Sequence, residues 1–429
     1  MGTTGPAARG PGLVRAMGRW DLAAGVVNGV IGSGIFVLPA ALAQHTGALS
    51  PLVFLLGGLG VFTVVLCFAE VSSRFQDAGG PYLYVREPFG PLAGFQVGWL
   101  HFWTRLLSAA AVLNVFVAYL GQLAPAVAHG PWRGVVMMVL VATLAALNVI
   151  GVKQATWTVN LFTLAKLLPL GLLILLGAPR ISDAVLATQG VARVDWTQAV
   201  LLVIFAYGGF ESAVIPAGEA RAPKRDMAFA LVVGMAVVAI LYATLQLVVV
   251  GVVPRVASAG SAPVAAAFRE LLGVSGGLVA AVAVLVSAYG WTTGFVLQTP
   301  RILFSMAERG EVPPILGRVH PRFRTPYVAI LVNAALALAL ALYGSFAWAA
   351  TISVITRLIV YLIVCAALLA LRLRKPHEAP GFRLRGGAAI PVAGIAFCLW
   401  LLATRTYEQA WIILGIMAAG AALWLLRRS

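Results

Sequence analysis

The stretch that decides the fold is Trp20–Gln44, W-D-L-A-A-G-V-V-N-G-V-I-G-S-G-I-F-V-L-P-A-A-L-A-Q. It is apolar and long enough to span a bilayer, which takes about 20 residues in a helix. Its centre, however, is Gly32-Ser33-Gly34, and each glycine in a helix interior costs about 1 kcal/mol relative to alanine. Pro39 follows shortly afterwards. The pattern therefore predicts a membrane-spanning helix that is interrupted near its midpoint.

An interruption at this depth has two interpretations. It leaves backbone N–H and C=O groups without helical partners, which lipid cannot supply, so the break must face protein or a water-filled cavity. Freed N–H groups at the start of the second half-helix can bind an anion, and freed C=O groups can bind a cation. One unwound turn can therefore bind both ends of a zwitterion. The alternative is that the small residues only let two helices pack closely.

The whole chain has the composition of a polytopic membrane protein. Its 429 residues are 61% hydrophobic and 10% charged, whereas a soluble domain carries about 25% charged residues. The net charge of +16 does not indicate nucleic acid binding, because the basic residues lie in short loops, as the positive-inside rule describes. The three cysteines lie in apolar segments, and the histidines lack metal-ligand spacing. We expect no metal, no cofactor and no nucleotide site.

Hydropathy and loop signals predict twelve membrane-spanning helices. Their approximate ranges are 20–43, 49–73, 91–121, 133–151, 155–177, 195–217, 227–252, 277–308, 326–343, 346–371, 390–404 and 408–426. The first is a full-length span rather than a short cleavable segment, so no signal peptide is predicted. The distribution of basic residues predicts cytoplasmic N- and C-termini and a multi-pass protein of the cell membrane. The arginine-rich and alanine-rich composition suggests a bacterial source.

The span over 195–217 carries a second interruption. Gly208-Gly209 lies near its middle, and Pro216 follows. Corresponding interruptions in two halves of a chain indicate an inverted-repeat transporter with its binding site between them. The two interrupted spans are five apart, and an odd number of spans per repeat inverts the second copy. This coincidence favours a functional break over simple close packing.

Four stretches of the chain carry a family resemblance. They are G-S-G-I-F-V-L-P at 32–39, A-G-G-P-Y-L-Y at 78–84, F-A-Y-G-G-F-E at 205–211 with G-E-A-R-A-P-K-R-D at 218–226, and R-I-L-F-S-M-A-E-R-G-E-V-P-P at 301–314 with H-P-R-F-R-T-P at 320–326. Together they resemble the amino acid–polyamine–organocation (APC) superfamily of transporters, over residues 17 to 371.

The resemblance implies an all-α, LeuT-like fold in which helices 1 and 6 are broken. A cytoplasmic tail would occupy residues 1–19. Two inverted five-helix repeats would occupy 20–177 and 195–371, and two additional transmembrane helices would occupy 390–426.

The resemblance also implies a substrate site at the two breaks. The substrate carboxylate would meet the backbone N–H groups around Ser33, Gly34 and Ile35. The α-amine would meet the carbonyl groups near Val30 and Ile31 and around Phe205, Ala206 and Gly208. Phe205 occupies the family position of an aromatic residue that caps the substrate.

Side-chain recognition is expected from Phe205 together with Ala109, Val112 and Trp291. Trp291 resembles a tryptophan on the substrate path of arginine/agmatine antiporters, although a packing role fits it equally well. Ala109 falls where those antiporters have a polar contact. This departure leaves the pocket mainly apolar and weakens the case for a cationic substrate.

Lys166 lies in the middle of the span over 155–177. A charge at this depth costs at least a few kcal/mol and marks a functional candidate, whereas a snorkelling lysine is the alternative. In family members with a lysine here, the ammonium replaces the Na⁺ of sodium-coupled relatives and touches the unwound part of the first helix. We therefore expect proton coupling or obligatory exchange.

Three further intramembrane charges are notable. Glu211 directly follows the second break, where a structural role and a role in proton transfer are both open. Arg105 and Arg357 are expected to face the interior or the cytoplasmic vestibule, and Glu70 is a candidate partner for them.

The sequence predicts a secondary transporter of neutral amino acids that works by alternating access. The alternatives are a basic amino acid or polyamine antiporter and an amino acid exporter. An integral-membrane enzyme would need a convergent catalytic set, which is not evident, and a channel would conduct without counterflow. We expect the partners to be the substrate, protons or a counter-transported amino acid, and lipid, but no nucleic acid. The assembly is expected to be a monomer or a homodimer.

Overall fold

A computed structural model describes residues 18–32, 34–75, 80–151, 156–213, 222–374 and 380–427. All regular structure in these ranges is helical, without a strand. The helices are α1 (Arg19–Val30), α2 (Gly34–Thr46), α3 (Ser50–Ser72), α4 (Gly80–Phe89), α5 (Pro91–Leu123), α6 (Gly130–Ile150), α7 (Thr156–Gly177), α8 (Asp183–Ala187), α9 (Trp196–Tyr207), α10 (Phe210–Ala213), α11 (Pro223–Val252), α12 (Pro263–Gln298), α13 (Pro300–Glu308), α14 (Tyr327–Tyr343), α15 (Phe346–Arg374), α16 (Ala389–Ala403) and α17 (Tyr407–Leu426).

Each range that hydropathy predicted contains helix, and the all-helical class is confirmed for the described residues. Seven helical stretches in this part of the chain are long and apolar enough to cross a membrane, and α14 and α16 are shorter apolar helices. The first predicted range holds both α1 and α2, and the sixth holds α9 and α10. The helices therefore end where the glycines predicted interruptions.

The single helix expected over 277–308 is instead two helices, α12 and α13. They are separated at Thr299-Pro300, because proline lacks the N–H group that would continue the helix. α12 also begins earlier than expected and bends at Gly273, where φ is +72° and ψ is −165°. Only glycine adopts this conformation readily, so the part of α12 before the bend forms a separate helical segment.

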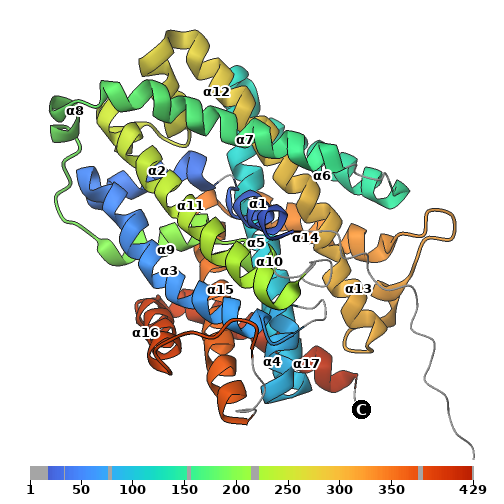
Figure 1. Cartoon of the computed structure of the whole chain (residues 1–429). Helices are drawn as coiled ribbons and strands as arrows, with labels where there is room; N and C mark the ends of the chain where they lie inside the picture. The colour runs from blue at the N-terminus through green and yellow to red at the C-terminus, as the bar shows by residue number, and fades with distance from the viewer. Residues whose placement is uncertain are drawn as a thin grey trace, which may run out of the picture.

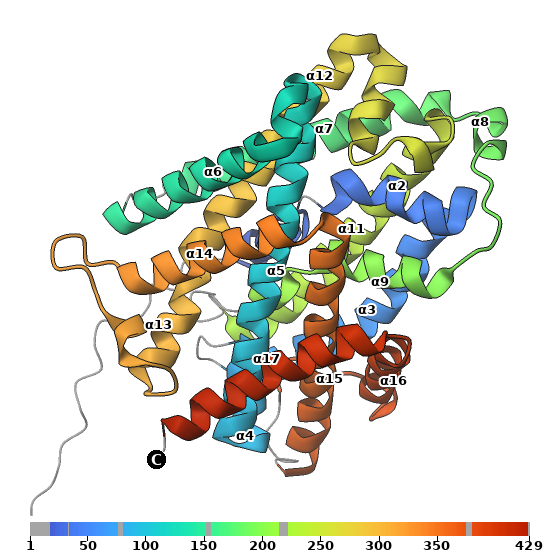
Figure 2. The ribbon, with the colours of Figure 1, turned by 180° about the vertical axis from the view of Figure 1, so that it is seen from behind.

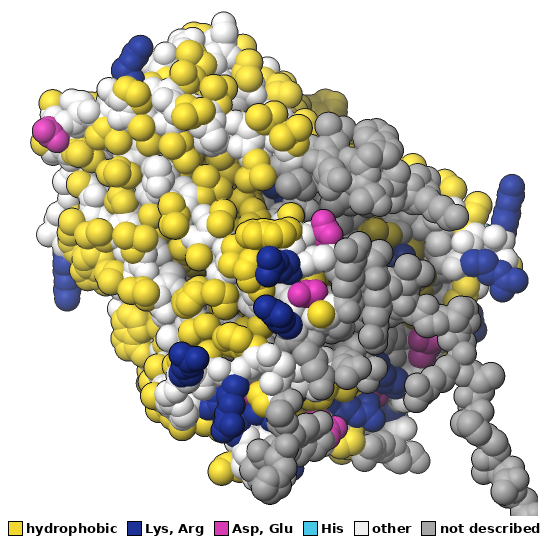
Figure 3. Space-filling model, viewed as in Figure 1, with side chains coloured by type: hydrophobic (Ala, Val, Ile, Leu, Met, Phe, Trp, Pro, Cys, Tyr) yellow, Lys and Arg dark blue, Asp and Glu magenta, His cyan; other side chains and the backbone are white. Residues whose placement is uncertain are grey.

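The centre of the bundle is formed by α5 and α15. Figure 2 shows α5 running through the middle of the molecule beside α15, with α17 crossing both. α5 also packs against α12 and α14, while α3 packs against α9, α11 and α16 (Figure 1). Hydrophobic side chains cover much of the outer face (Figure 3), as expected for a surface that contacts lipid.

Small polar side chains join α5 to α15. Ser108 Oγ lies 2.8 Å from Ser353 Oγ, and Thr104 Oγ1 donates to Thr356 Oγ1 over 2.8 Å. All four side chains are buried. Small residues let helices approach closely in a membrane, and hydroxyl groups can hydrogen-bond across the contact. This seam fixes the two helices that carry Arg105 and Arg357.

Candidate functional site

The two interrupted helices meet at their breaks, near the labels α1 and α10 in Figure 1. Gly209 has φ +122°, and a side chain added there would lie 2.3 Å from the carbonyl oxygen of Gly29. A side chain added at Gly208 would lie 2.0 Å from Arg357 Nη1. Gly209 therefore requires glycine, for reasons of both conformation and space, whereas a side chain at Gly208 would displace the Arg357 guanidinium.

The backbone at the end of α1 departs from the regular hydrogen-bonding pattern of an α-helix. Ile31 has φ −70° and ψ +86°, and the Gly32 N–H donates to Val30 O over 2.7 Å. Tyr242 OH also donates to Val30 O, over 3.2 Å. α2 begins at Gly34, and its first N–H groups have no intrahelical acceptors. Gly34 and Ile35 are thus at a helix N-terminus, as expected, while Ser33 lies outside the described residues.

Lys166 reaches the break from α7. Its ammonium donates to Asn28 O and to Ile31 O, each over 3.0 Å, and the residue is 4% exposed. Two carbonyl groups at the end of α1 therefore hold a positive charge inside the bundle. A snorkelling lysine would extend to the surface instead, so the geometry contradicts that alternative.

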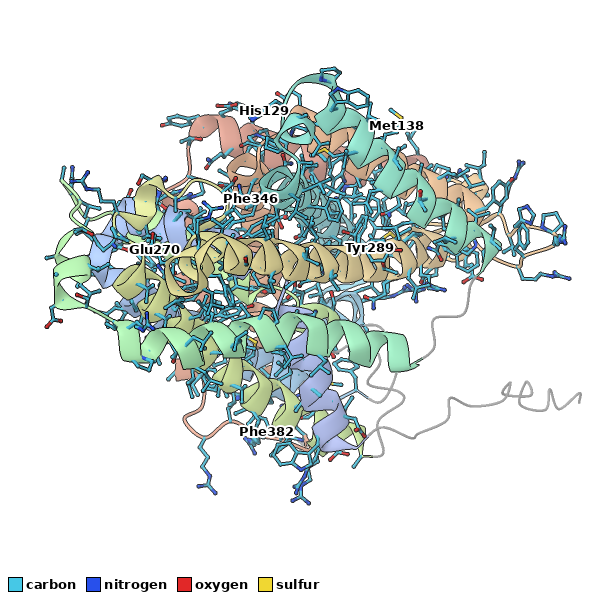
Figure 4. The ribbon with its side chains drawn as sticks, turned by 90° about the horizontal axis from the view of Figure 1, so that it is seen from above. His129, Met138, Glu270, Tyr289, Phe346 and Phe382 are labelled. Carbon is cyan, nitrogen blue, oxygen red and sulfur yellow. The ribbon has the colours of Figure 1, made fainter. Side chains whose placement is uncertain are left out.

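Phe205 lies over the start of α2. A side chain added at Gly34 would be 2.9 Å from Phe205 Cδ1 and 3.7 Å from Ala206 Cα. The ring of Phe205 also makes an edge contact with Phe346, labelled in Figure 4, with ring centroids 5.7 Å apart. The aromatic residue, Ala206 and the first turn of α2 are therefore brought together.

Trp291 reaches the break from α12. A side chain added at Gly32 would lie 3.5 Å from the Trp291 indole. Ala109 and Val112 are buried side chains on α5. The structure thus gathers the two aromatic candidates, Phe205 and Trp291, at the break.

Arg105 connects Trp291 to α5. Its guanidinium carbon lies 5.0 Å from the centre of the Trp291 ring, and its Nε donates to Thr299 Oγ1 over 3.5 Å. It forms no ion pair with a carboxylate in the described part of the chain. A cation over an indole face gains electrostatic stabilisation, which increases when both groups are desolvated.

Glu211 holds the second break to α15. It accepts hydrogen bonds from Arg357 Nε over 3.0 Å, from Tyr361 OH over 3.0 Å and from the Gly209 N–H over 2.8 Å. These contacts fit the structural role that the sequence left open for Glu211, but Arg357 and Tyr361 were not predicted as its partners. The available signal was a lone intramembrane carboxylate beside the glycines, which needs a buried cation as its partner.

The suggestion that Glu70 pairs with Arg105 or Arg357 is wrong. Glu70 instead forms ion pairs with Arg74 and Arg372, near the end of α3. Arg74 follows Glu70 by four positions, so the two lie on the same face of one chain segment, whereas Arg372 arrives from α15.

Two interrupted apolar helices that meet in a bundle core, with a buried charge at the junction, are typical of membrane transporters. The chain belongs to the amino acid permease family, whose profile matches residues 17–421. This finding confirms the resemblance to the APC superfamily.

The chain is similar to three transporters of Bacillus subtilis (strain 168). It is 28% identical to the serine/threonine exchanger SteT over 388 residues, which cover 88% of each chain. It is 26% identical to the branched-chain amino acid permease BcaP over 438 residues, covering 94% of this chain and 92% of BcaP. It is 26% identical to a methylthioribose transporter over 412 residues, covering 91% and 88%. The family and these relatives are transporters and not enzymes.

Proposed function

We propose that this protein transports neutral amino acids across the bacterial cytoplasmic membrane by alternating access, with proton coupling or amino acid exchange. One observation carries the proposal: the Lys166 ammonium donates hydrogen bonds to the carbonyl groups of Asn28 and Ile31 at the first break. A coupling metal ion would need oxygen atoms of this kind. The resident ammonium supplies the positive charge itself, which favours transport without sodium.

The charge balance at the breaks supports a neutral substrate. Lys166, Arg105 and Arg357 are buried there, and Glu211 is the carboxylate that accompanies them. Glu211 already accepts hydrogen bonds from Arg357 and Tyr361. A lysine, arginine or polyamine substrate would have to place another positive charge in this setting, with no uncommitted carboxylate among the described residues of the breaks.

The substrate would bind with its carboxylate at the first N–H groups of α2, around Ser33, Gly34 and Ile35. Its α-amine would lie at the carbonyl groups of Val30 and Ile31 and of the second break, at Phe205, Ala206 and Gly208. Phe205 would cover it, since this ring already lies against Gly34. Trp291, Ala109 and Val112 would contact its side chain.

We also propose two inverted five-helix repeats over 20–177 and 195–371, followed by two additional helices over 390–426, with both termini in the cytoplasm. The close approach of Gly209 to Gly29 supports the pairing of the two repeats, because inverted repeats place their broken helices at a shared midplane. The names of SteT and BcaP specify neutral amino acids, which is consistent with the proposed substrate class.

Transport by purified protein in liposomes tests the proposal. Uptake of serine, threonine, valine, leucine, lysine and agmatine is measured at two pH values, into empty and into preloaded vesicles. Stimulation by internal amino acid without pH dependence identifies an exchanger, and acid-stimulated uptake into empty vesicles identifies a symporter. Uptake confined to lysine and agmatine, or no uptake of any compound, would refute the proposal.

A further inference from the structure

A pocket of about 710 Å³ lies between the end of α15 and the segment that leads into α16. Leu369 and Leu373 line one part of it, and Arg383 and Arg385 line another. The volume falls within the range of small-ligand sites. The pocket is far in sequence from both helix breaks, and nothing in the transport proposal uses it.

The wall of this pocket is held in place by α3. Glu70 Oε2 accepts from the Leu384 N–H over 2.9 Å. Ser73 Oγ both donates to Phe382 O and accepts from the Phe382 N–H, each over 3.1 Å. Arg372 bridges Glu70 and the carbonyl of Gly387. The segment between α15 and α16 is therefore anchored on both sides of Arg383, and a pre-formed site loses less entropy when it binds a ligand.

The pocket is positively charged. The charge of Arg372 is balanced by its ion pair with Glu70. Arg383 and Arg385 are exposed, and neither forms an ion pair with another described residue. The N-terminus of α16 also borders the pocket, through Ala388, and a helix N-terminus carries partial positive charge. Figure 3 shows Lys and Arg side chains gathered at the lower edge of a largely hydrophobic face.

The pocket is apolar on its α15 side. Leu373 is 82% exposed, although it lies in the last turn of a helix long and apolar enough to cross a membrane. The end of a membrane-spanning helix lies near the boundary between hydrocarbon and headgroups, so we infer that Leu373 faces this boundary. Basic and apolar groups thus lie side by side, at the end of a spanning helix.

We propose that this pocket binds one anionic phospholipid. The phosphate would pair with Arg383 and Arg385, and an acyl chain would lie along Leu369 and Leu373. Anionic lipids attract basic groups at the cytoplasmic surface of membranes, and basic pockets between spanning helices bind their headgroups. A soluble phosphate would use the arginines but would leave the leucines without a partner, so the apolar wall selects a lipid.

Native mass spectrometry of the purified full-length protein tests the proposal. Phosphatidylglycerol is titrated against the delipidated wild type and against the double variant Arg383→Gln/Arg385→Gln. The matched control is Arg318→Gln/Arg322→Gln, which removes two exposed arginines outside the pocket. The wild type and the control should retain one phosphatidylglycerol that the pocket variant binds at least about tenfold more weakly, since each arginine contributes about one kcal/mol at a charged membrane surface.

Phosphatidylcholine and inorganic phosphate complete the experiment. Phosphatidylcholine should not show the difference between wild type and pocket variant, and equimolar inorganic phosphate should not displace the bound lipid. The unfolding temperatures without lipid should be equal, which excludes misfolding. Three results would overturn the proposal. The pocket variant could retain phosphatidylglycerol as well as the wild type does, or the control could lose as much lipid as the pocket variant does. Inorganic phosphate could also displace the bound lipid. It depends on a bilayer around the protein but not on which solute is transported, so it can fail independently of the transport function.

Discussion

Arg357 Nε donates to Glu211 Oε1 over 3.0 Å, and the two residues are 4% and 1% exposed. This ion pair joins α15 to the short helix α10, directly after the second break. The same carboxylate accepts the Gly209 N–H, so one side chain fixes both the backbone of the break and its distance from α15. The position of the break is therefore set by a contact between residues 146 positions apart.

Removing one partner of this ion pair should destabilise the protein. Glu211→Gln leaves Arg357 buried without a counter-charge, which costs about 3–5 kcal/mol in comparable buried pairs. We expect a clearly lower unfolding temperature in detergent, and partial recovery in Glu211→Gln/Arg357→Gln. The control is Glu270→Gln, at an exposed residue near the edge of the molecule in Figure 4. Equal unfolding temperatures for the two single variants would contradict the prediction.

The glycines of the second break should not tolerate a methyl group. Gly208→Ala would bring Cβ to 2.0 Å from Arg357 Nη1, and Gly209→Ala would bring it to 2.3 Å from Gly29 O. Overpacking of this kind costs about 1–3 kcal/mol. Gly415→Ala on α17 has open space around it and should gain up to about 1 kcal/mol in helix propensity. Thermal unfolding of the three variants checks the prediction: Gly208→Ala and Gly209→Ala should unfold at a lower temperature than the wild type, and Gly415→Ala should not.

Lys166→Met should abolish coupled uptake. The variant removes the ammonium from Asn28 O and Ile31 O and leaves both carbonyl groups without this donor. Uptake is measured with a pH gradient and, separately, with internal amino acid. Gly415→Ala serves as the control for expression and reconstitution. Full pH-dependent uptake by Lys166→Met would show that the lysine is not the coupling residue.

Changes in the aromatic cover should alter which amino acid is preferred. Phe205→Leu removes the ring that contacts Gly34 and Phe346. A change of this size in a hydrophobic pocket is worth about 1–3 kcal/mol, so the ratio of serine uptake to leucine uptake should shift about tenfold or more. The control is Trp411→Phe, because Trp411 is 71% exposed. An unchanged ratio would mean that the side-chain pocket lies elsewhere.

Tyr82 on α4 should stabilise the protein over a wide pH range. Its O–H donates to Glu311 Oε1 over 2.8 Å. Burial, together with the Glu311 carboxylate, raises the pKa of Tyr82 above its usual value. Because the folded-state pKa is raised, the contribution of the O–H is fully present below the unfolded pKa of about 10. This contribution to stability is lost only as the pH rises through the pKa of Tyr82 in the folded protein.

Tyr82→Phe should therefore lower the free energy of unfolding by about 1 kcal/mol. The loss should be the same at pH 6 and pH 9 and should shrink at more alkaline pH. Tyr407→Phe is the matched control, since Tyr407 is 89% exposed. If the loss in free energy of unfolding differed between pH 6 and pH 9, the hydrogen bond from Tyr82 to Glu311 would not be its cause.

Local features of the sequence determined the helices and their interruptions. Gly32 and Gly34 in one apolar run, and Gly208 and Gly209 in another, predicted breaks that the structure contains at the same places. Glycine has a low helix propensity in any context, and hydropathy is a property of consecutive residues. Both signals can therefore be read along the chain without knowledge of its folding.

Tertiary structure alone decided the partners of the buried charges. Arg357 pairs with Glu211, and Glu70 pairs with Arg372, which is 302 positions away. The sequence showed that each charge needs a partner, because an unpaired buried charge is costly. It did not show which partner, because an ion pair depends on distance in space, and the packing of α3, α5, α10 and α15 sets that distance.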